Sequence, residues 1–430
     1  MIKIIKEKIN SIYEFVFKEK MSQNAFSFLK NIRYALFGYG LAAVFVFGFE
    51  VLSGRILGPE EYGKYVLVSS IGSFLFFLMT LGINTAVIKY VAENEENSKH
   101  IISTSYVLVL IAILSLSLIF FAFSSQISNL FSVSEYIFNL AVVFAGFLSL
   151  YTISVDVLRS LHQIKKLSLF RMLYGAVLFI LLIALFLQKQ VLFETIVFSI
   201  IISYFLIFIL TTINLRQYIS LKINKSWVQR LLKYGLYTMI GEMFFILLPI
   251  LGKIFVNKHL GLKDVGIYNA YYFSSINIAL FLYTVFIVVF FPMISRKEDK
   301  SSILAKIEKI TPYLFILGIP FLILTQAVII KIYGAFYAAN FILMLLFAIA
   351  GILIFLYGLY IWFFYSMEIS KARFATLTTI AMFTANIFFG SYFVKNFFEL
   401  GAVFSIIITF LIGLIILLAY KTTILNRNER

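Results

Sequence analysis

Three charged side chains interrupt long apolar stretches of the sequence, where they could do chemistry. Glu242 lies inside "LYTMIGEMFFILLPILGK", Lys253 closes that stretch, and Glu50 lies near the end of an earlier one. A lone charge at the centre of a bilayer costs about 2.5–3.5 kcal/mol, so each group needs a partner or water. We expect Glu50 and Lys253 to face each other and help to close a passage. The alternative is that both side chains snorkel to the interface.

Other polar and helix-breaking residues lie at the ends of apolar stretches or within them. Asp156 and Arg159 are three positions apart, so they can pair on one helix face. Arg55 contributes to a moderately basic rim at the outer ends of the apolar stretches. Pro249 removes a backbone hydrogen bond from its helix and predicts a bend, which is either a hinge or a static kink.

A short polar turn occurs twice in the chain. "RILGPEEYGKY" (55–65) and "KHLGLKDVGIY" (258–268) are 203 positions apart and share glycine, leucine and tyrosine at matching places. The same shift places Lys253 on Glu50. This pattern predicts a duplicated bundle in which each copy has the turn between its first two helices. Glycine supplies backbone freedom there, and the hinge candidates are Gly58, Pro59, Gly63, Pro249, Gly261 and Gly266.

The composition is that of a polytopic helical membrane protein. Of 430 residues, 62% are hydrophobic and 13% are charged, against about 25% charged in soluble domains. Apolar stretches of about 20 residues, long enough to cross a bilayer, recur along the chain. The chain has no cysteine, and its three histidines lie far apart. We therefore expect no disulfide, no metal site and no cofactor.

Hydropathy predicts twelve spans, and lysine and arginine counts predict their orientation. The spans are 34–54, 66–88, 101–123, 137–158, 167–187, 192–213, 234–256, 267–292, 313–332, 338–364, 374–394 and 400–420. With the amino terminus inside, 28 of the 36 basic residues fall on the cytoplasmic side and 8 outside. The imbalance predicts that both termini are cytoplasmic. It also explains the net charge of +16 without nucleic acid.

The predicted fold is all-α, with two parallel six-helix lobes around a central cavity. An even number of spans separates the two turns, so the lobes have the same orientation in the membrane. The predicted parts are an amphipathic cytoplasmic segment (1–33), a first lobe (34–214), a basic linker (215–233), a second lobe (234–420) and a cytoplasmic tail (421–430). Transporters built from such repeats place their substrate path between the lobes.

Three stretches of the chain resemble one protein family. They are "RILGPEEYGKY", "LGINTAVIKYVAE" (81–93) and "IKIYGAFYAA" (330–339). In them the sequence resembles the polysaccharide-biosynthesis flippases of the multidrug/oligosaccharidyl-lipid/polysaccharide exporter superfamily. The resemblance implies a plasma-membrane protein that moves a polyprenyl-linked oligosaccharide to the outer leaflet by alternating access. It also implies that Asn84, Lys89 and Asn277 line the cavity. The residue usage, with 26 lysines to 10 arginines, predicts a prokaryotic source.

The chemistry of such a substrate suggests a driving force. Moving a diphosphate head with about two negative charges outward gains about 4–5 kcal/mol per 100 mV. The sequence has no GxxxxGK[ST] loop for ATP. If a coupling ion, Na⁺ or H⁺, drives transport instead, Glu242 is its first candidate carboxylate. The alternatives are a drug or cation antiporter of the same superfamily, or a membrane glycosyltransferase or polymerase, for which the external loops are too short.

Overall fold

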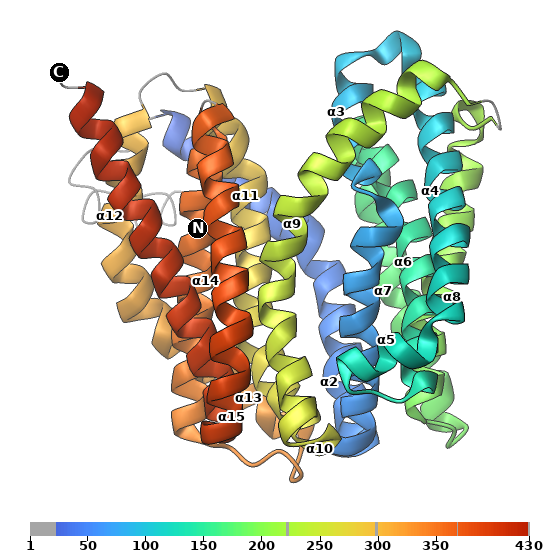
Figure 1. The fold of residues 1–430 in the computed structure, drawn as a ribbon, viewed down its shortest axis with the longest axis vertical. Helices are drawn as coiled ribbons and strands as arrows, with labels where there is room; N and C mark the ends of the chain where they lie inside the picture. The colour runs from blue at the N-terminus through green and yellow to red at the C-terminus, as the bar shows by residue number, and fades with distance from the viewer. Residues whose placement is uncertain (1–22, 221–222, 297–299, 368, 429–430) are drawn as a thin grey trace, which may run out of the picture.

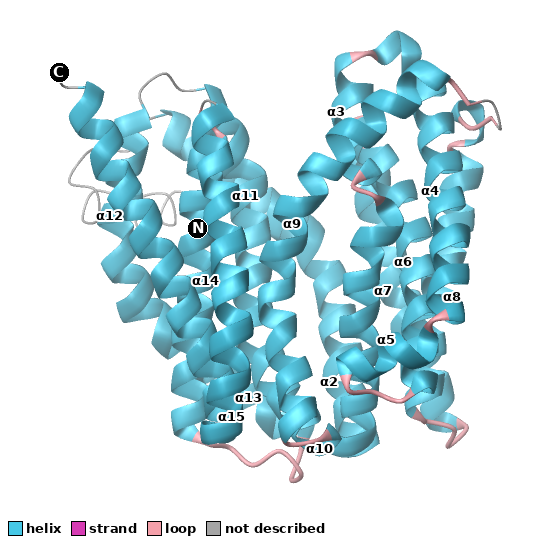
Figure 2. Ribbon diagram, viewed as in Figure 1, coloured by secondary structure: helices cyan, strands magenta, loops and turns pink. Residues whose placement is uncertain are grey.

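The computed structural model describes residues 23–220, 223–296, 300–367 and 369–428. Within these ranges every regular element is a helix (Figure 2). The elements are α2 (Gln23–Thr80), α3 (Ile83–Glu93), η1 (Glu95–Asn97), α4 (Ser98–Ala122), α5 (Ser124–Phe131), α6 (Glu135–Ser160), α7 (Ile164–Leu187), α8 (Phe193–Asn214), η2 (Arg216–Tyr218), α9 (Lys225–His259), α10 (Leu262–Tyr272), η3 (Phe273–Asn277), α11 (Ile278–Arg296), α12 (Lys300–Tyr313), η4 (Leu314–Gly318), α13 (Ile319–Tyr333), α14 (Phe341–Tyr365) and α15 (Ile369–Asn428). Helices satisfy their backbone hydrogen bonds internally, as lipid requires. Most of the predicted amphipathic segment lies outside the described residues.

Two of the helical elements contain a chain reversal. The Tyr62 hydroxyl donates to Glu50 at 2.8 Å, although twelve residues of straight helix would span about 18 Å. The chain therefore turns back at Gly58, which has φ 74°. In α15 the backbone at Gly401 approaches that of Phe393 in the same way, across the turn at Phe398.

The described residues contain enough apolar helix for twelve membrane crossings. Nine continuous stretches are long and apolar enough to span a bilayer. Two of them, Ala42–Thr80 and Arg373–Tyr420, contain the reversals and therefore cross twice. The twelfth crossing is α9, which bends by 42° between Gly241 and Met243. This bend lies before Pro249 rather than at it. The predicted all-α membrane fold is confirmed.

The helices form two lobes, which α9 joins. In the first lobe α2 packs on α6 and α7, and α6 packs on α8. In the second lobe α14 packs on α11, α13 and α15. The beginning of α9 packs on the first lobe through Trp227 and Tyr234, which contact Tyr90. Its later part packs on α15, where Phe244 contacts Phe383.

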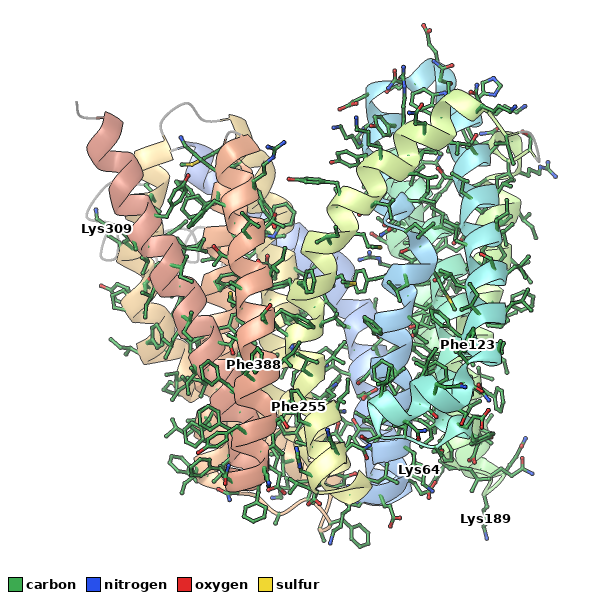
Figure 3. All side chains as sticks on the ribbon, viewed as in Figure 1. Lys64, Phe123, Lys189, Phe255, Lys309 and Phe388 are labelled. Atoms are coloured by element: carbon green, nitrogen blue, oxygen red, sulfur yellow. The ribbon has the colours of Figure 1, made fainter. Side chains whose placement is uncertain are left out.

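The two lobes repeat the same turn at the same end of the molecule. Gly58 (φ 74°, ψ 168°) and Gly261 (φ 112°, ψ −179°) adopt one backbone conformation that disfavours any side chain. Pro59 begins the next helix, where its missing N–H costs nothing. Figure 1 shows the lobes converging at this end, which carries α10 and the reversal in α2, and diverging toward the end where α2 begins and α15 finishes. We call the end with the turns the predicted outer end; Lys64 and Lys189 lie there (Figure 3).

Candidate functional site

A buried polar cluster joins the two lobes near the predicted outer end. Tyr62 and Tyr333 have no exposed surface, and Asn269 and Lys253 are almost fully buried. We call this group the outer cluster; its members are Glu50, Tyr62 and Tyr65 of α2, Lys253 of α9, Asn269 of α10 and Tyr333 of α13. Because buried polar groups are costly without partners, the hydrogen bonds of this cluster determine what it can do.

Glu50 is the acceptor at the centre of the outer cluster. The Tyr62 and Tyr65 hydroxyls donate to its two carboxylate oxygens at 2.8 and 2.7 Å. Hydrogen bonds to a charged acceptor are the stronger kind. The reversal at Gly58 is what brings both tyrosines back alongside Glu50.

The network continues from Tyr62 into the second lobe. The Asn269 Nδ2 donates to the Tyr62 hydroxyl at 2.8 Å, and the hydroxyls of Tyr62 and Tyr333 lie 3.0 Å apart. Since the one proton of Tyr62 goes to Glu50, Tyr333 must be the donor in that pair. Separating the lobes at this end would break both bonds.

Lys253 is the one cationic member of the outer cluster. Its ammonium sits 4.3 Å from the centre of the Tyr272 ring, and its charge interacts with that of Glu50. The two groups do not form a direct ion pair, because the cation rests on the aromatic ring instead. The two charges therefore attract each other across the lobes without direct contact.

The lobes also touch through a reciprocal backbone contact. A Cβ placed on Gly63 would meet the carbonyl oxygen of Leu262, and a Cβ on Gly266 would meet the carbonyl oxygen of Pro59. Gly63 and Gly266 are 203 positions apart, as are Pro59 and Leu262. The contact is therefore self-complementary, like an interface around a twofold axis. Gly63 and Gly266 lie inside helices and permit close approach.

Three further hydrogen bonds join the lobes around the outer cluster. The Arg55 Nη1 donates to the carbonyl of Ile332 at 3.0 Å, and the Tyr337 hydroxyl donates to the carbonyl of Gly54 at 2.8 Å. Asn257 donates to the carbonyl of Ser132 at 2.6 Å. Arg55 thus bonds to the other lobe, although its side chain is exposed.

The remaining candidates from the sequence lie away from the outer cluster. Asn84 donates to Asp156, which is buried in α6. Arg159 is exposed and acts on Asp156 only through its charge, together with Arg171. Asp156 therefore interacts with Asn84 and Arg171 as well as with Arg159, its predicted partner. The structure does not bring these groups to Glu50.

The last site candidates from the sequence are Lys89, Asn277 and Glu242. The Lys89 ammonium lies 4.2 Å from the centre of the Tyr234 ring, where α3 meets α9. Asn277 ends the π-helix η3 and is half-buried; such π-turns often occur at functional sites. Glu242 belongs to α9, but its side chain is outside the described part of the structure.

Sequence reasoning missed the tyrosines and Asn269 of the outer cluster. The sequence attributes most tyrosines to aromatic belts at the interfaces, and nothing in its periodicity separates Tyr62 or Tyr333 from them. The one available signal was position, because Tyr62 and Tyr65 lie within the repeated turn and Tyr333 lies in the "IKIYGAFYAA" stretch.

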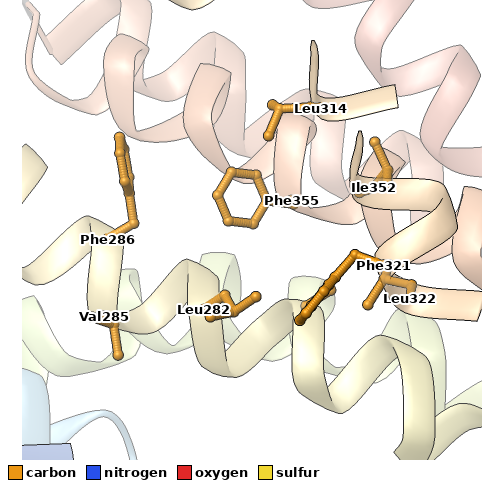
Figure 4. Close-up of a pocket in the computed structure, with 10 residues that line it drawn as sticks. Leu282, Val285, Phe286, Leu314, Phe321, Leu322, Ile352 and Phe355 are labelled. Carbon is orange, nitrogen blue, oxygen red and sulfur yellow. The ribbon is translucent and has the colours of Figure 1, made fainter. Parts of the chain in front are cut away.

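An apolar pocket in the second lobe contrasts with the outer cluster. It has a volume of about 270 Å³ and lies between α11, η4, α13 and α14 (Figure 4). Leu282, Phe286, Phe321 and Phe355 are among its lining residues. With this lining it offers a charged head group no partner. Among the described residues, no group of three histidine or acidic side chains could hold a metal ion.

Comparison with known proteins identifies the family. The sequence model described as "Polysaccharide biosynthesis protein" matches residues 28–298. The chain belongs to this family. No curated protein sequence matches it. The resemblance found in the sequence is thereby confirmed.

Solved structures similar to this family member are membrane transporters and flippases. The lipid II flippase MurJ in an inward closed conformation matches with a TM-score of 0.67 and 14% identity, over 89% of this chain and 87% of that one. A transporter of the MOP superfamily from Pyrococcus furiosus matches with a TM-score of 0.63 and 12% identity, over 94% and 99%. An inward-facing MATE multidrug resistance transporter matches with a TM-score of 0.62 and 12% identity, over 90% of this chain and 96% of that one. The chain is a multi-pass membrane protein with their fold.

Proposed function

We propose that this protein is a flippase that moves a lipid-diphosphate-linked oligosaccharide from the cytoplasmic to the outer leaflet for surface glycan assembly. The observation that supports this proposal is the match of residues 28–298 to the polysaccharide biosynthesis family. We further propose that it works in a prokaryotic cell membrane with both termini cytoplasmic. It acts without enzymatic chemistry, on a polyprenyl-linked substrate.

Alternating access requires a passage that closes at one end at a time. The outer cluster and the reciprocal glycine contact join the lobes at the predicted outer end, where Asn269, Tyr62 and Tyr333 are hydrogen-bonded. The ribbons diverge at the other end (Figure 1). This arrangement supports an inward-open state, which receives the head group from the cytoplasm while the lipid tail stays in the bilayer. The lobes then rock about the axis between them.

Transport in vesicles tests the proposal. Purified protein is reconstituted with a fluorescent polyprenyl-diphosphate sugar, and the fraction reaching the opposite leaflet is followed with a membrane-impermeant quencher. We expect protein-dependent exchange that accelerates when the potential favours outward movement of negative charge. Exchange equal to that of protein-free vesicles refutes the function. Exchange that ignores the potential but follows a Na⁺ or H⁺ gradient assigns a coupling ion.

A drug or cation antiporter is the second candidate. The observation that favours it is the structural similarity to a multidrug resistance MATE transporter. It predicts efflux of a cationic dye from loaded vesicles against a cation gradient. Dye efflux without lipid exchange would select this candidate.

A further inference from the structure

A second pocket lies at the predicted outer end of the second lobe, apart from the outer cluster. Its volume is about 490 Å³, within the range of roughly 300–1,000 Å³ typical of small-molecule sites. Its walls come from α10, from the loop between α13 and α14, and from the turn within α15. Neither closure of the lobes nor the proposed passage uses it.

Aromatic rings stand at this pocket without being buried. Phe336 is 72% exposed, Phe397 49% and Phe398 61%, and all three line the pocket. Phe398 has φ 55°, a conformation that is strained for a bulky residue and that tends to persist at ligand sites. Exposed ring faces carry partial negative charge, which attracts the C–H groups of a flat ligand.

Hydrogen-bond donors and acceptors both lie beside these aromatic rings. Lys263 and Glu399 line the pocket, and Asp264 lies near enough to Glu399 for the two acidic groups to interact. The carboxyl oxygens of Glu399 can accept hydrogen bonds from a ligand. Lys263 supplies donors.

The loop that forms one wall is held in place. The Tyr271 hydroxyl donates to the carbonyl of Ala338 and accepts the backbone N–H of Asn340. Asn340 in turn caps α14 by accepting the N–H of Leu343. A loop fixed in this way is preorganised for a ligand.

We propose that this pocket binds an uncharged pyranose unit of a glycan at the outer face. Ring faces stack on sugar C–H groups, while carboxylate oxygens and an ammonium bond to neighbouring hydroxyls. The pocket of Figure 4 has only the apolar half of this combination. The choice of a sugar as the ligand rests on the proposed function. The existence of the pocket is independent of that function.

Direct binding to the full-length protein tests this site without any transport. The probes are N-acetylglucosamine, galactose and glucuronic acid, observed by saturation-transfer NMR on protein in lipid nanodiscs. We expect transfer to a neutral sugar, weakened at least tenfold in Phe398→Ala and in Glu399→Gln. Phe388→Ala is the matched control, because Phe388 (labelled in Figure 3) is 73% exposed on the same helix and is not among the residues that line the pocket; it should bind like the wild type.

The outcomes separate this site from the flippase function. Absence of sugar binding, or binding unchanged by both pocket variants, overturns the site even if lipid exchange occurs. Sugar binding without lipid exchange overturns the proposed function and leaves the site standing. Stronger binding of glycerophosphocholine than of any sugar would assign the pocket to lipid head groups and overturn the proposal. Size-exclusion profiles verify that Glu399→Gln folds, so one variant remains informative if Phe398→Ala does not.

Discussion

Replacing Gly63 with alanine tests whether the reciprocal glycine contact closes the outer end. A Cβ at Gly63 would fall 2.0 Å from the carbonyl oxygen of Leu262, whereas ordinary contact begins at 3.4 Å. The two helices must therefore move apart by up to about 1.4 Å (3.4 − 2.0). Rotating a side chain cannot relieve the clash, because the obstructing atom belongs to the backbone.

Such a movement reaches the outer cluster. The bond from Asn269 to Tyr62, now 2.8 Å, would lengthen to as much as about 4.2 Å, beyond hydrogen-bonding range. The contact between Tyr62 and Tyr333 would lengthen in the same way from 3.0 Å. Each bond contributes about 0.5–1.5 kcal/mol. Losing both destabilises the closed state by about 1–3 kcal/mol, a change of about 5–150-fold in its population relative to the open state.

Pulsed electron paramagnetic resonance measures this population. The chain has no cysteine, so spin labels can be placed at Glu60 and Lys258, both exposed at the outer end. We expect a longer-distance population in Gly63→Ala and, by the twofold relation, in Gly266→Ala. Gly40→Ala is the matched control, because nothing beyond its own helix backbone lies within 4 Å of the added Cβ. A distance distribution in Gly63→Ala equal to that of the wild type refutes the reasoning.

Three other substitutions have defined expectations. Glu50→Gln removes the charge that acts on Lys253 across the lobes and should lower the population of the closed state; the same resonance experiment measures it, and an unchanged distribution contradicts it. Asn84→Ala deprives buried Asp156 of a donor and should cost about 1–3 kcal/mol in thermal unfolding, while an unchanged melting temperature removes that role. Phe398→Gly removes backbone strain of about 1–3 kcal/mol at the positive φ against about 0.5–1 kcal/mol of added chain entropy, so it should stabilise the protein yet weaken sugar binding; a lower melting temperature would show that the turn is not strained.

Hydropathy and the repeated turn predicted most of the fold because both depend on local chemistry. Apolar length indicates a span wherever it occurs, and a glycine before a second apolar stretch indicates a turn. The bend in α9 was placed at Pro249 because proline removes a backbone bond. The observed bend, between Gly241 and Met243, lies where the helix passes from one lobe to the other, and no single-helix pattern encodes that.

For a similar reason, the sequence predicted only some members of the outer cluster. Glu50 and Lys253 stand out because charge is rare in apolar sequence. Tyr62 and Tyr333 do not, since one tyrosine in a membrane protein resembles another until its hydroxyl has a partner. Their pairing depends on a contact 271 residues apart in sequence, and a contact of that range leaves no trace in periodicity.

The twofold relation between the lobes explains which repeated positions stay alike and which differ. Near such an axis a residue lies close to its own counterpart: a Cβ on Gly63 would lie 3.3 Å from the backbone nitrogen of Gly266. Two backbones can approach so closely only if both copies keep glycine. At Glu50 and Lys253 identity would instead place like charges together, which repel in a buried site. Opposite charges remove that repulsion and attract each other across the interface. Closure of the outer end therefore favours the same residue in both repeats at Gly63 and Gly266, and residues of opposite charge at Glu50 and Lys253.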